Sequence, residues 1–480
     1  MYKEDEIKAY EKEHFQKVEK DPYRCSFHLI PPVGWMNDPN GLCYFKGMYH
    51  VFFQYAPAYP QDEIKMWGHY VSEDFINWSY EGVAVYPDTE YDVTGAFSGS
   101  AYVEDDILHI FYTGNVELPG DYDYTTAGRL SNTIHITSED GFHFSPKEVV
   151  LQNKDYPPHY SCHIRDPKVF KTKTGYGMVL GGRTKEDRGT ILLYQSEDLE
   201  NWSFLREITS PWDFGFMWEC PDIFTLTDEK GNKATILSMS PQGLPKEEFR
   251  YQNAHQSGYL FLKGENEKEY EVTDTFAEWD MGFDFYAPQT FEDNKGRRIL
   301  MGWIGVSGAE YEEPTVENGW IHQMTLPGEL TLRDGYIYRY PVKEIEKLHD
   351  GEIIITPGVP VENPGGCFDL FLENPDNEEF EIILSKELRF AYTKDTLLLE
   401  FPKGKGHDRT IRKCKCDKLE NLRILADGCV VEIYANKGKQ VFTTKFFPKY
   451  MNYPINLQML TTTRCMVKLH KMRKRKFAKI

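Results

Sequence analysis

The segment DPNGLCYF (38–45), followed by MYHVFFQ (48–54), is the first copy of a unit that recurs along this chain of 480 residues. A polar or acidic opening leads into an alternating strand, a turn and a second apolar strand. Four later segments share this outline, and they open at Phe97, Arg165, Glu219 and Phe285. Roughly 60 residues per unit are enough for a blade of four strands, so the repeat is typical of a propeller.

Five such units predict an all-β fold, a five-bladed β-propeller followed by a C-terminal β-sandwich. We expect the propeller at residues 21–340, after an N-terminal helical segment at 1–20. Apolar residues at helical spacing predict a linker helix at 341–350. Residues 351–480 contain short alternating runs separated by turn signals, which favours the sandwich. The eight predicted strands are 352–356, 367–372, 379–384, 396–401, 422–425, 430–434, 441–446 and 455–460.

The repeat also predicts which residues meet. In a propeller the first strand of each blade lines the central channel, so equivalent positions converge on the axis. Asp38, Asp166 and Glu219 lie at the openings of three different units. We therefore expect these three carboxylates to share one funnel that can hold a small polar ligand.

Composition excludes several classes of partner. A formal charge of -20 argues against nucleic acid, whose phosphates need clustered cations. No apolar stretch is long enough to cross a bilayer, so we expect no membrane partner. The charged N-terminus lacks the pattern of a secretion signal, and this predicts a cytoplasmic protein. Association into a homo-oligomer stays open.

Nine cysteines are scattered along the chain without CxxC pairs, which favours reduced thiols over a zinc site. We expect neither a metal nor another cofactor.

Asp38 lies in the stretch GWMNDPNG (34–41), between amide side chains and beside aromatic residues. Amides donate to and accept from hydroxyls, rings supply a flat apolar wall, and an ionised carboxylate could attack an anomeric carbon. The same residues are also typical of a turn, since Asp and Asn bond their own backbone and Gly permits positive φ. Only the two later acidic motifs favour the catalytic interpretation.

Glu219 follows the bulky apolar residues Phe216, Met217 and Trp218, a frame expected to raise its pKa and keep a proton available for a leaving oxygen. Asp166 follows Arg165, whose guanidinium should keep it charged, and a fixed anion can bind hydroxyls and stabilise an oxocarbenium-like state. Taken singly, each motif could have a structural role. Arg165 and Asp166 could form a structural ion pair, Glu219 could be a buried turn residue, and Trp218 could be a core residue. No single structural requirement explains why three of the repeated units open with an acidic residue.

Together these motifs resemble glycoside hydrolase family 32, which includes invertases, sucrose-6-phosphate hydrolases, levanases and inulinases. The resemblance spans nearly the whole chain and is carried by WMNDPNG (35–41), FFQY (52–55), WGH (67–69), FSGSA (97–101), RDP (165–167), ECPD (219–222) and YAPQ (286–289). It implies that Asp38 is the nucleophile on a β-fructofuranosyl unit, Glu219 the acid/base and Asp166 the transition-state stabiliser. The substrate-binding residues that we predict are Trp35, Asn37, Gln54, Trp67, Phe97, Ser98, Arg165 and Trp303.

The implied activity is retaining hydrolysis of sucrose, sucrose 6-phosphate or short fructo-oligosaccharides through a fructosyl-Asp intermediate. Fructosyl transfer on the same scaffold and a non-catalytic carbohydrate-binding propeller stay as alternatives. Two departures from the family pattern concern the sugar site: the Trp usual between Gln54 and Trp67 is absent, and Gly328 stands where Arg is common. Trp67 and Trp303 could also be core residues, as most tryptophans are.

Overall fold

The computed structural model describes residues 4–273, 276–309, 311–460 and 466–475. Strands dominate these residues, which confirms the all-β expectation. The one α-helix among them, α1 (Glu4–Glu19), lies against the first sheet, where Tyr55 and Tyr80 donate hydroxyl hydrogen bonds to its buried Glu11. None of the helices in the described ranges has the length and apolar character needed to span a membrane.

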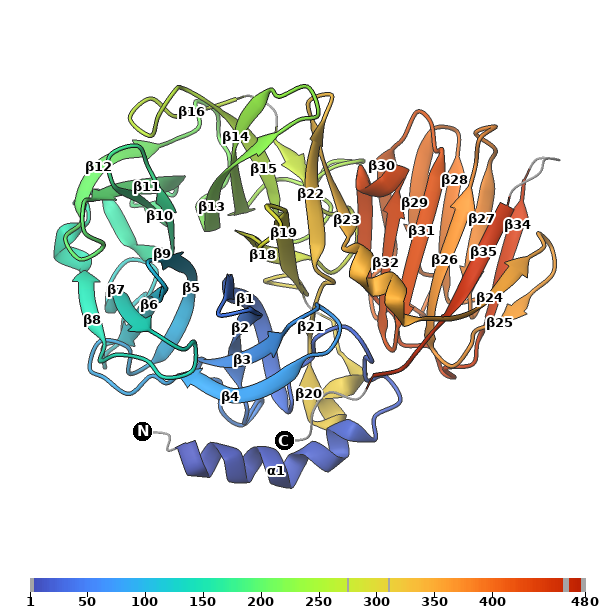
Figure 1. The fold of residues 1–480 in the computed structure, drawn as a ribbon, viewed down its shortest axis with the longest axis horizontal. Helices are drawn as coiled ribbons and strands as arrows, with labels where there is room; N and C mark the ends of the chain where they lie inside the picture. Colours follow the sequence, from blue (N-terminus) through green and yellow to red (C-terminus); the bar gives the residue numbers. More distant parts are fainter. Residues whose placement is uncertain (1–3, 274–275, 310, 461–465, 476–480) are drawn as a thin grey trace.

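Five sheets lie around a common centre and form the larger part of the molecule, which we call the five-sheet body (Figure 1). The first sheet has the order β20-β1-β2-β3-β4, the second β5-β6-β7-β8, the third β12-β11-β10-β9. Their strands are β1 (Gly34–Phe45), β2 (Met48–Ala56), β3 (Met66–Ser72), β4 (Ser79–Val85), β20 (Trp320–Ile321), β5 (Gly95–Glu104), β6 (Ile107–Glu117), β7 (Arg129–Ser138), β8 (Glu148–Leu151), β9 (Tyr160–Lys171), β10 (Tyr176–Thr184), β11 (Gly189–Ser196) and β12 (Ser203–Ile208).

The fourth sheet has the order β13-β14-β15-β16 with β17 beside β15, and the fifth has β18-β19-β22-β23 with β21 beside β19. Their strands are β13 (Met217–Thr227), β14 (Lys233–Gln242), β15 (Gly258–Lys263), β16 (Glu271–Val272), β17 (Ala277–Glu278), β18 (Tyr286–Glu292), β19 (Arg298–Ile304), β21 (Gln323–Met324), β22 (Gly328–Arg333) and β23 (Tyr336–Pro341). Short 3-10 helices, η1 (Asn153–Asp155) and η2 (Pro314–Asn318), lie in the connections.

The first strand of each sheet faces the centre. Neighbouring first strands contact one another in the order β1, β5, β9, β13 and β18, and β18 contacts β1. Polar side chains connect them: Ser100 donates to the Pro167 carbonyl, and Lys168 lies 3.3 Å from the carboxylate of Asp222, which also accepts from Thr290. These contacts fix the first strands relative to one another at the point where the predicted site residues lie.

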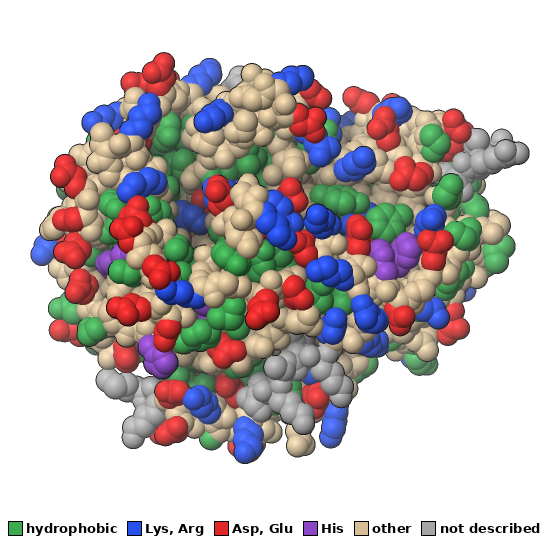
Figure 2. Space-filling view, in the orientation of Figure 1, with side chains coloured by type: hydrophobic (Ala, Val, Ile, Leu, Met, Phe, Trp, Pro, Cys, Tyr) green, Lys and Arg blue, Asp and Glu red, His purple; other side chains and the backbone are tan. Residues whose placement is uncertain are grey.

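Burial follows the same arrangement. β2 is buried along nearly its whole length because other sheets cover both of its faces, whereas the outer strands β4 and β12 are mostly half-exposed or exposed. Continuous apolar runs such as VFF in β2 therefore belong to inner positions, and alternating runs belong to the rim. On the face shown in Figure 2, acidic and basic side chains are interspersed over the surface.

A 3-10 helix, η3 (Lys343–Leu348), connects β23 to the C-terminal pair of sheets, each of six strands. The first sheet contains β24 (His349–Ile355), β35 (Met466–Met472), β26 (Cys367–Glu373), β31 (Asn421–Asp427), β32 (Val430–Ala435) and β33 (Gln440–Lys445). The second contains β25 (Val361–Glu362), β34 (Pro454–Met459), β27 (Phe380–Leu384), β28 (Leu388–Thr393), β29 (Thr396–Glu400) and β30 (Ile411–Lys415). One apolar cluster, which includes Phe368, Leu370, Phe390 and Leu397, packs between them. A last 3-10 helix, η4 (Asn436–Gly438), follows β32.

All eight strands predicted in this region are present, and β25, β28, β30 and β35 were not predicted. The sequence IRKCK of β30 has three cations and only two apolar residues, which do not alternate, so its strand signal is weak. In MVKLHKM of β35, buried Val467 and Leu469 do alternate with Lys468 and His470, so this strand could have been predicted.

Candidate active site

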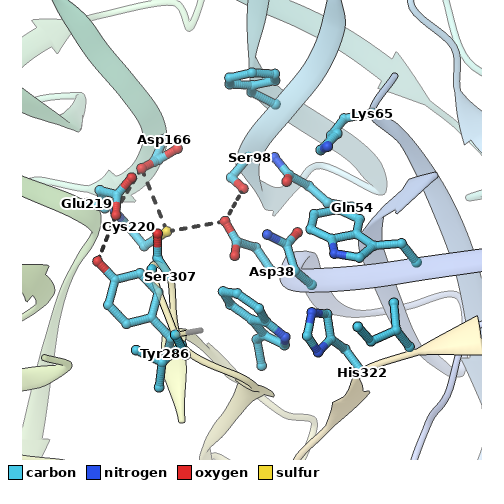
Figure 3. A pocket seen from close by; sticks show the side chains of 18 of the residues that line it. Asp38, Gln54, Lys65, Ser98, Asp166, Glu219, Cys220, Tyr286, Ser307 and His322 are labelled. Atoms are coloured by element: carbon cyan, nitrogen blue, oxygen red, sulfur yellow. Dashed lines mark hydrogen bonds between the residues drawn. The ribbon is translucent and has the colours of Figure 1, made fainter. Parts of the chain in front are cut away.

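A cavity of about 480 Å³ opens at the centre of the five-sheet body. Every predicted site residue except Trp67 lines it: Trp35, Asn37, Asp38, Gln54, Phe97, Ser98, Arg165, Asp166, Glu219 and Trp303. Figure 3 shows Asp38, Asp166 and Glu219 directed into this space from different strands. Residues separated by up to 268 positions in the chain therefore meet in one pocket, as the repeat predicts.

Each first strand is irregular at the position where it reaches the cavity. The register with the second strand shifts between Met36 and Pro39, and equivalent shifts occur in β5, β9, β13 and β18. Asp166, Cys220 and Ala287 adopt positive φ values of 64°, 48° and 47° at these shifts. Bulges redirect side chains and are common beside active sites. Here they direct the acidic side chains into the cavity instead of along the sheet.

Asp38 is held by the neighbouring sheet. Ser98 Oγ donates a hydrogen bond to Asp38 Oδ2 over 2.6 Å, and Cys220 Sγ lies 3.7 Å from the same oxygen. Burial raises the pKa of Asp38 to about 7, with the charges of Asp166 and Glu219 acting in the same direction and Ser98 opposing them. Asp38 is therefore more desolvated than its amide-rich sequence suggested.

Asp166 is buried and makes defined contacts. Its backbone amide donates to Thr113 Oγ1 at 2.9 Å, and its Oδ2 accepts from the backbone amide of Cys220 at 2.9 Å. Burial raises the pKa of Asp166 to about 6, although the charge of Arg165 opposes the shift. Cys220 Sγ lies 3.7 Å from both Asp166 Oδ2 and Asp38 Oδ2, and the charge of Asp166 raises the pKa of Asp38.

Glu219 has three hydrogen-bonding partners. Arg165 Nη2 donates to Oε1 at 2.6 Å, while Gln242 Nε2 and Tyr286 Oη donate to Oε2 at 2.6 and 2.7 Å. Burial raises the pKa of Glu219, but the charge of Arg165 and these hydrogen bonds outweigh it, so the pKa is lowered overall.

This differs from the sequence expectation of a raised pKa in an apolar frame. Side chains alternate along a strand, so Trp218 points into a core cluster and is fully buried there, away from the carboxylate of Glu219. Arg165, expected to hold Asp166, forms its hydrogen-bonded ion pair with Glu219.

The carboxylates therefore form a coupled group with one cation. Because the pKa values of Asp38 and Asp166 are raised and that of Glu219 is lowered, the first proton taken up near neutral pH lies on the side of Asp38 and Asp166. One carboxylate that can attack and one that can exchange a proton within a single cavity are the requirements of retaining glycoside cleavage.

Aromatic rings form part of the wall of the cavity. The ring of His322 lies edge-on to Trp303, with centroids 5.0 Å apart, and edge-on to Trp35 at 6.2 Å. Trp303 thus lines the cavity, whereas Trp67 is fully buried behind it and donates its indole N–H to the Phe97 carbonyl at 3.1 Å. Trp67 supports the wall and makes no direct contact with the cavity.

Sequence reasoning missed several residues of the site: Tyr286, Gln242, Cys220, Lys65, His322 and Lys445. Tyr286 and Cys220 lie at unit openings, so the repeat could have indicated them. Lys65 lies where the stretch without the usual Trp approaches the pocket, and its Nζ is 4.5 Å from the centroid of the Trp35 ring. Lys445 comes from β33 of the C-terminal sheets, and no local pattern in the sequence relates it to the centre.

Among the described residues, one group of metal-ligand type side chains comes close together: Cys25, His28 and Asp427. The Asp427 carboxylate accepts hydrogen bonds from three consecutive backbone amides (26–28) and lies 3.0 Å from His28 Nδ1. Burial lowers the pKa of His28, but Asp427 and Glu432 raise it to about 9. A protonated imidazole paired with a saturated carboxylate fits a structural ion pair better than a metal site.

Comparison with known proteins agrees with this geometry. Residues 28–341 match the model of the glycosyl hydrolases family 32 N-terminal domain, and residues 390–466 match that of the family 32 C-terminal domain. The sucrose-6-phosphate hydrolase of Bacillus subtilis is 38% identical over 464 residues, covering 92% of this chain and 94% of that protein. The raffinose invertase of Escherichia coli is 34% identical over 443 residues, covering 88% and 89%.

Solved structures of similar fold cover nearly the whole chain. The sucrose-6-phosphate hydrolase of Lactobacillus gasseri superposes with a TM-score of 0.87 at 26% identity, covering 99% of this chain and all of that one. A family 32 β-fructofuranosidase of Bombyx mori, in a variant bound to sucrose, has a TM-score of 0.84 at 29% identity and covers 98% of each chain.

Proposed function

Because the chain belongs to glycosyl hydrolases family 32, we propose that it releases fructose from sucrose 6-phosphate, with sucrose as a poorer substrate. Fructosyl-releasing glycosidase activity, of the β-fructofuranosidase type, is the function that its relatives and structural neighbours support. The observation that carries the proposal is the presence of Asp38 and Glu219 in one cavity, with Arg165 of the same cavity paired with Glu219. The preference for the phosphorylated sugar follows the names of several relatives, among them the sucrose-6-phosphate hydrolases of Bacillus subtilis and Klebsiella pneumoniae.

In the first step, Asp38 attacks the anomeric carbon of the fructosyl unit. The bond to the leaving oxygen breaks, and Glu219 transfers its proton to that oxygen. Ser98 and Cys220 both contact Oδ2 of Asp38, which leaves Oδ1 for the attack. The step requires the less populated arrangement of the single proton, on Glu219 with Asp38 ionised, because the pKa shifts favour the proton on the side of Asp38.

In the second step, water attacks the same carbon while Glu219 accepts its proton. The bond to Asp38 breaks and the carboxylate is restored. Asp166, fixed by its backbone contacts, provides negative charge beside the oxocarbenium-like ring in both steps. Asn37, Gln54 and Arg165 have donors in the cavity for the fructose hydroxyls.

We also propose that the sheets form a propeller and a sandwich joined by a linker. Contacts between successive first strands, from β1 round to β18 and back to β1, support a closed five-bladed propeller at 21–340. The two six-stranded sheets support a β-sandwich at 351–480, with 341–350 as the linker. A cytoplasmic location stays a prediction, and so does the oligomeric state.

The substrate is tested by incubating the purified chain with sucrose, sucrose 6-phosphate and kestose while free fructose and longer oligosaccharides are measured. We expect fructose from all three and the highest kcat/KM with sucrose 6-phosphate. Growth of oligosaccharides with little free fructose contradicts hydrolysis and indicates transfer. Absence of turnover with all three substrates indicates a binding protein.

A further inference from the structure

A continuous series of polar contacts leads from the proposed acid/base, through Arg165 and His163, to a second arginine that lines the cavity. Arg165 binds Glu219 through Nη2, and its Nη1 lies 3.1 Å from His163 Nδ1. The other ring nitrogen of His163 lies 3.2 Å from Arg129 Nη1. Arg165 and Arg129 both line the cavity, so a second guanidinium lies in the same pocket beyond the one that holds Glu219.

The strands explain this arrangement. His163 and Arg165 are two residues apart on β9, so their side chains point to the same face. Arg129 opens β7, where it is the cross-strand partner of Glu117 at the end of β6. The second and third sheets therefore each place one arginine at this edge of the cavity, with His163 between them.

The surroundings are rich in positive charge. Burial, followed by the charges of Arg165, Arg129 and Arg183, lowers the pKa of His163 to about 3, so this imidazole is neutral and separates the guanidinium groups. Glu117 accepts from Arg129 Nη2 at 2.7 Å, but its side chain is 37% exposed. Arg183 pairs with Asp187, which is 67% exposed. The carboxylates that pair with Arg129 and Arg183 are thus in contact with solvent, where water weakens their attraction to the guanidinium groups.

We propose that Arg129 binds the phosphate of sucrose 6-phosphate, an inference that rests on the proposed function. Glu219 protonates the leaving oxygen, so the glucosyl unit lies against Glu219 while fructose lies against Asp38. The phosphate is carried by that glucosyl unit and reaches outward on the same side. A guanidinium there offers a planar pair of N–H donors that matches phosphate oxygens. Each terminal nitrogen of Arg129 carries two N–H groups, and its one partner among the described residues is His163 for Nη1 and Glu117 for Nη2, so N–H donors remain for the phosphate.

Lys65 is the other cation with few contacts in the cavity. Its Nζ lies over the Trp35 ring and 3.8 Å from Glu63, which is well exposed. Figure 3 places Lys65 across the pocket from Glu219, with Asp38 and Gln54 nearer to it. A group on the leaving sugar therefore meets Arg129 and not Lys65. Replacement of Lys65 removes the same charge from the opposite wall and provides a matched control.

The test compares kcat/KM for sucrose 6-phosphate and for sucrose in the full chain and in the variants Arg129→Gln and Lys65→Gln. We expect Arg129→Gln to lower kcat/KM for sucrose 6-phosphate by about 10- to 100-fold, the loss of charge-assisted hydrogen bonds to an ion. Its kcat/KM for sucrose should change by less than about threefold, which also shows that the variant folds. Lys65→Gln should affect both substrates by a similar factor.

Replacing Glu117 should change the KM for sucrose 6-phosphate in the direction opposite to that of Arg129→Gln. Glu117 competes with phosphate for Arg129, so Glu117→Gln should lower KM for sucrose 6-phosphate and leave sucrose unchanged. If the Arg129–Glu117 pair had only a structural role, both substitutions would harm both substrates alike, and that result overturns the inference. Equal losses with the two substrates in Arg129→Gln, or no loss with either, also overturn it.

Product inhibition separates the inference from the proposed function. Glucose 6-phosphate should inhibit sucrose hydrolysis by the unmodified enzyme more strongly than glucose does, and Arg129→Gln should remove this difference. An unmodified enzyme that prefers sucrose to sucrose 6-phosphate contradicts the proposed substrate. A preference for sucrose 6-phosphate that survives in Arg129→Gln contradicts only the assignment of Arg129.

Discussion

Ser98 of the second sheet donates its hydroxyl hydrogen bond to Asp38 of the first sheet, with Oγ and Oδ2 2.6 Å apart. The proposed nucleophile is thus oriented by a residue 60 positions later in the chain. This bond lowers the pKa of Asp38, while burial raises it to about 7. We expect the balance between these two effects to set the alkaline limb of the pH profile of kcat/KM.

The reactive form holds one proton, on Glu219, while Asp38 is ionised. As the pH rises through about 7, the proton shared by the pair is lost and kcat/KM should fall. As the pH falls below the lowered pKa of Glu219, a second proton binds and kcat/KM should fall again. A pH profile of kcat/KM checks this, and its apparent pKa values belong to the coupled cluster.

Replacing Ser98 by Ala removes a hydrogen bond to the ionised form of Asp38 and raises its pKa. The alkaline limb of the kcat/KM profile should therefore move to higher pH, with kcat/KM at the optimum reduced about 10-fold by poorer orientation. A limb that stays in place or moves to lower pH contradicts the role given to Ser98.

Tyr286 acts on the other carboxylate. Its hydroxyl donates to Glu219 Oε2, and this bond lowers the pKa of Glu219. Tyr286→Phe should raise that pKa and move the acidic limb of the kcat/KM profile to higher pH, while the alkaline limb, set by Asp38, moves little. Ser98→Ala is the matched comparison, because its effect should fall on the opposite limb.

Removing the proton donor should strongly lower kcat. Glu219→Gln keeps the size of the side chain but cannot transfer a proton, so kcat for sucrose should fall by about 100- to 10,000-fold. The thermal unfolding midpoint should stay near that of the unmodified chain. Activity within a few fold of normal would exclude Glu219 as the acid/base.

The C-terminal sheets contribute to the pocket through Lys445, which is buried and forms an ion pair with Glu313 while lying 2.9 Å from His322 Nδ1. Lys445→Met leaves the Glu313 carboxylate buried beside His322 alone, and should lower the free energy of unfolding by about 3 kcal/mol. Urea unfolding at pH 7 measures this change. The double variant with Glu313→Gln is the control, because it removes the unpaired charge and should recover part of the loss.

The ion pair of Lys445 and Glu313 also predicts how the stability of the protein changes at low pH. Burial raises the pKa of Glu313, but Lys445 and His322 lower it to about 2, from an ordinary value of 4.5. Its contribution to stability is present above the ordinary pKa and is lost as the pH falls toward about 2. The stability difference between the unmodified chain and Lys445→Met should therefore shrink over that range, and a constant difference would contradict the pairing.

Much of the fold and of the site follows from the sequence because a repeated unit places its openings at one axis. The repeat alone predicts that Asp38, Asp166 and Glu219 share one pocket. The resemblance to glycoside hydrolase family 32 predicts the residues around them. The prolines after Asp38, Asp166, Cys220 and Ala287 are a further signal, since proline cannot complete a ladder and marks the register shifts.

What the sequence did not predict is set by neighbours distant in the chain. Trp218 adjoins Glu219 in sequence but lies on the other face of the strand, so the apolar frame does not reach the carboxylate. Arg165 adjoins Asp166 but binds Glu219 on another sheet. Trp67 occupies the core behind the wall, and His322 and Lys65 supply parts of the pocket that no motif indicated.

The central claim is that fructose passes through a bond to Asp38. The enzyme is mixed with sucrose, quenched in acid during turnover, digested and analysed by mass spectrometry, with Asp38→Ala as the control. We predict one fructosyl group on the peptide that contains Asp38, and neither label nor activity in the variant. A fructosyl group on a different peptide, or sucrose hydrolysis by Asp38→Ala at a normal rate, would contradict it.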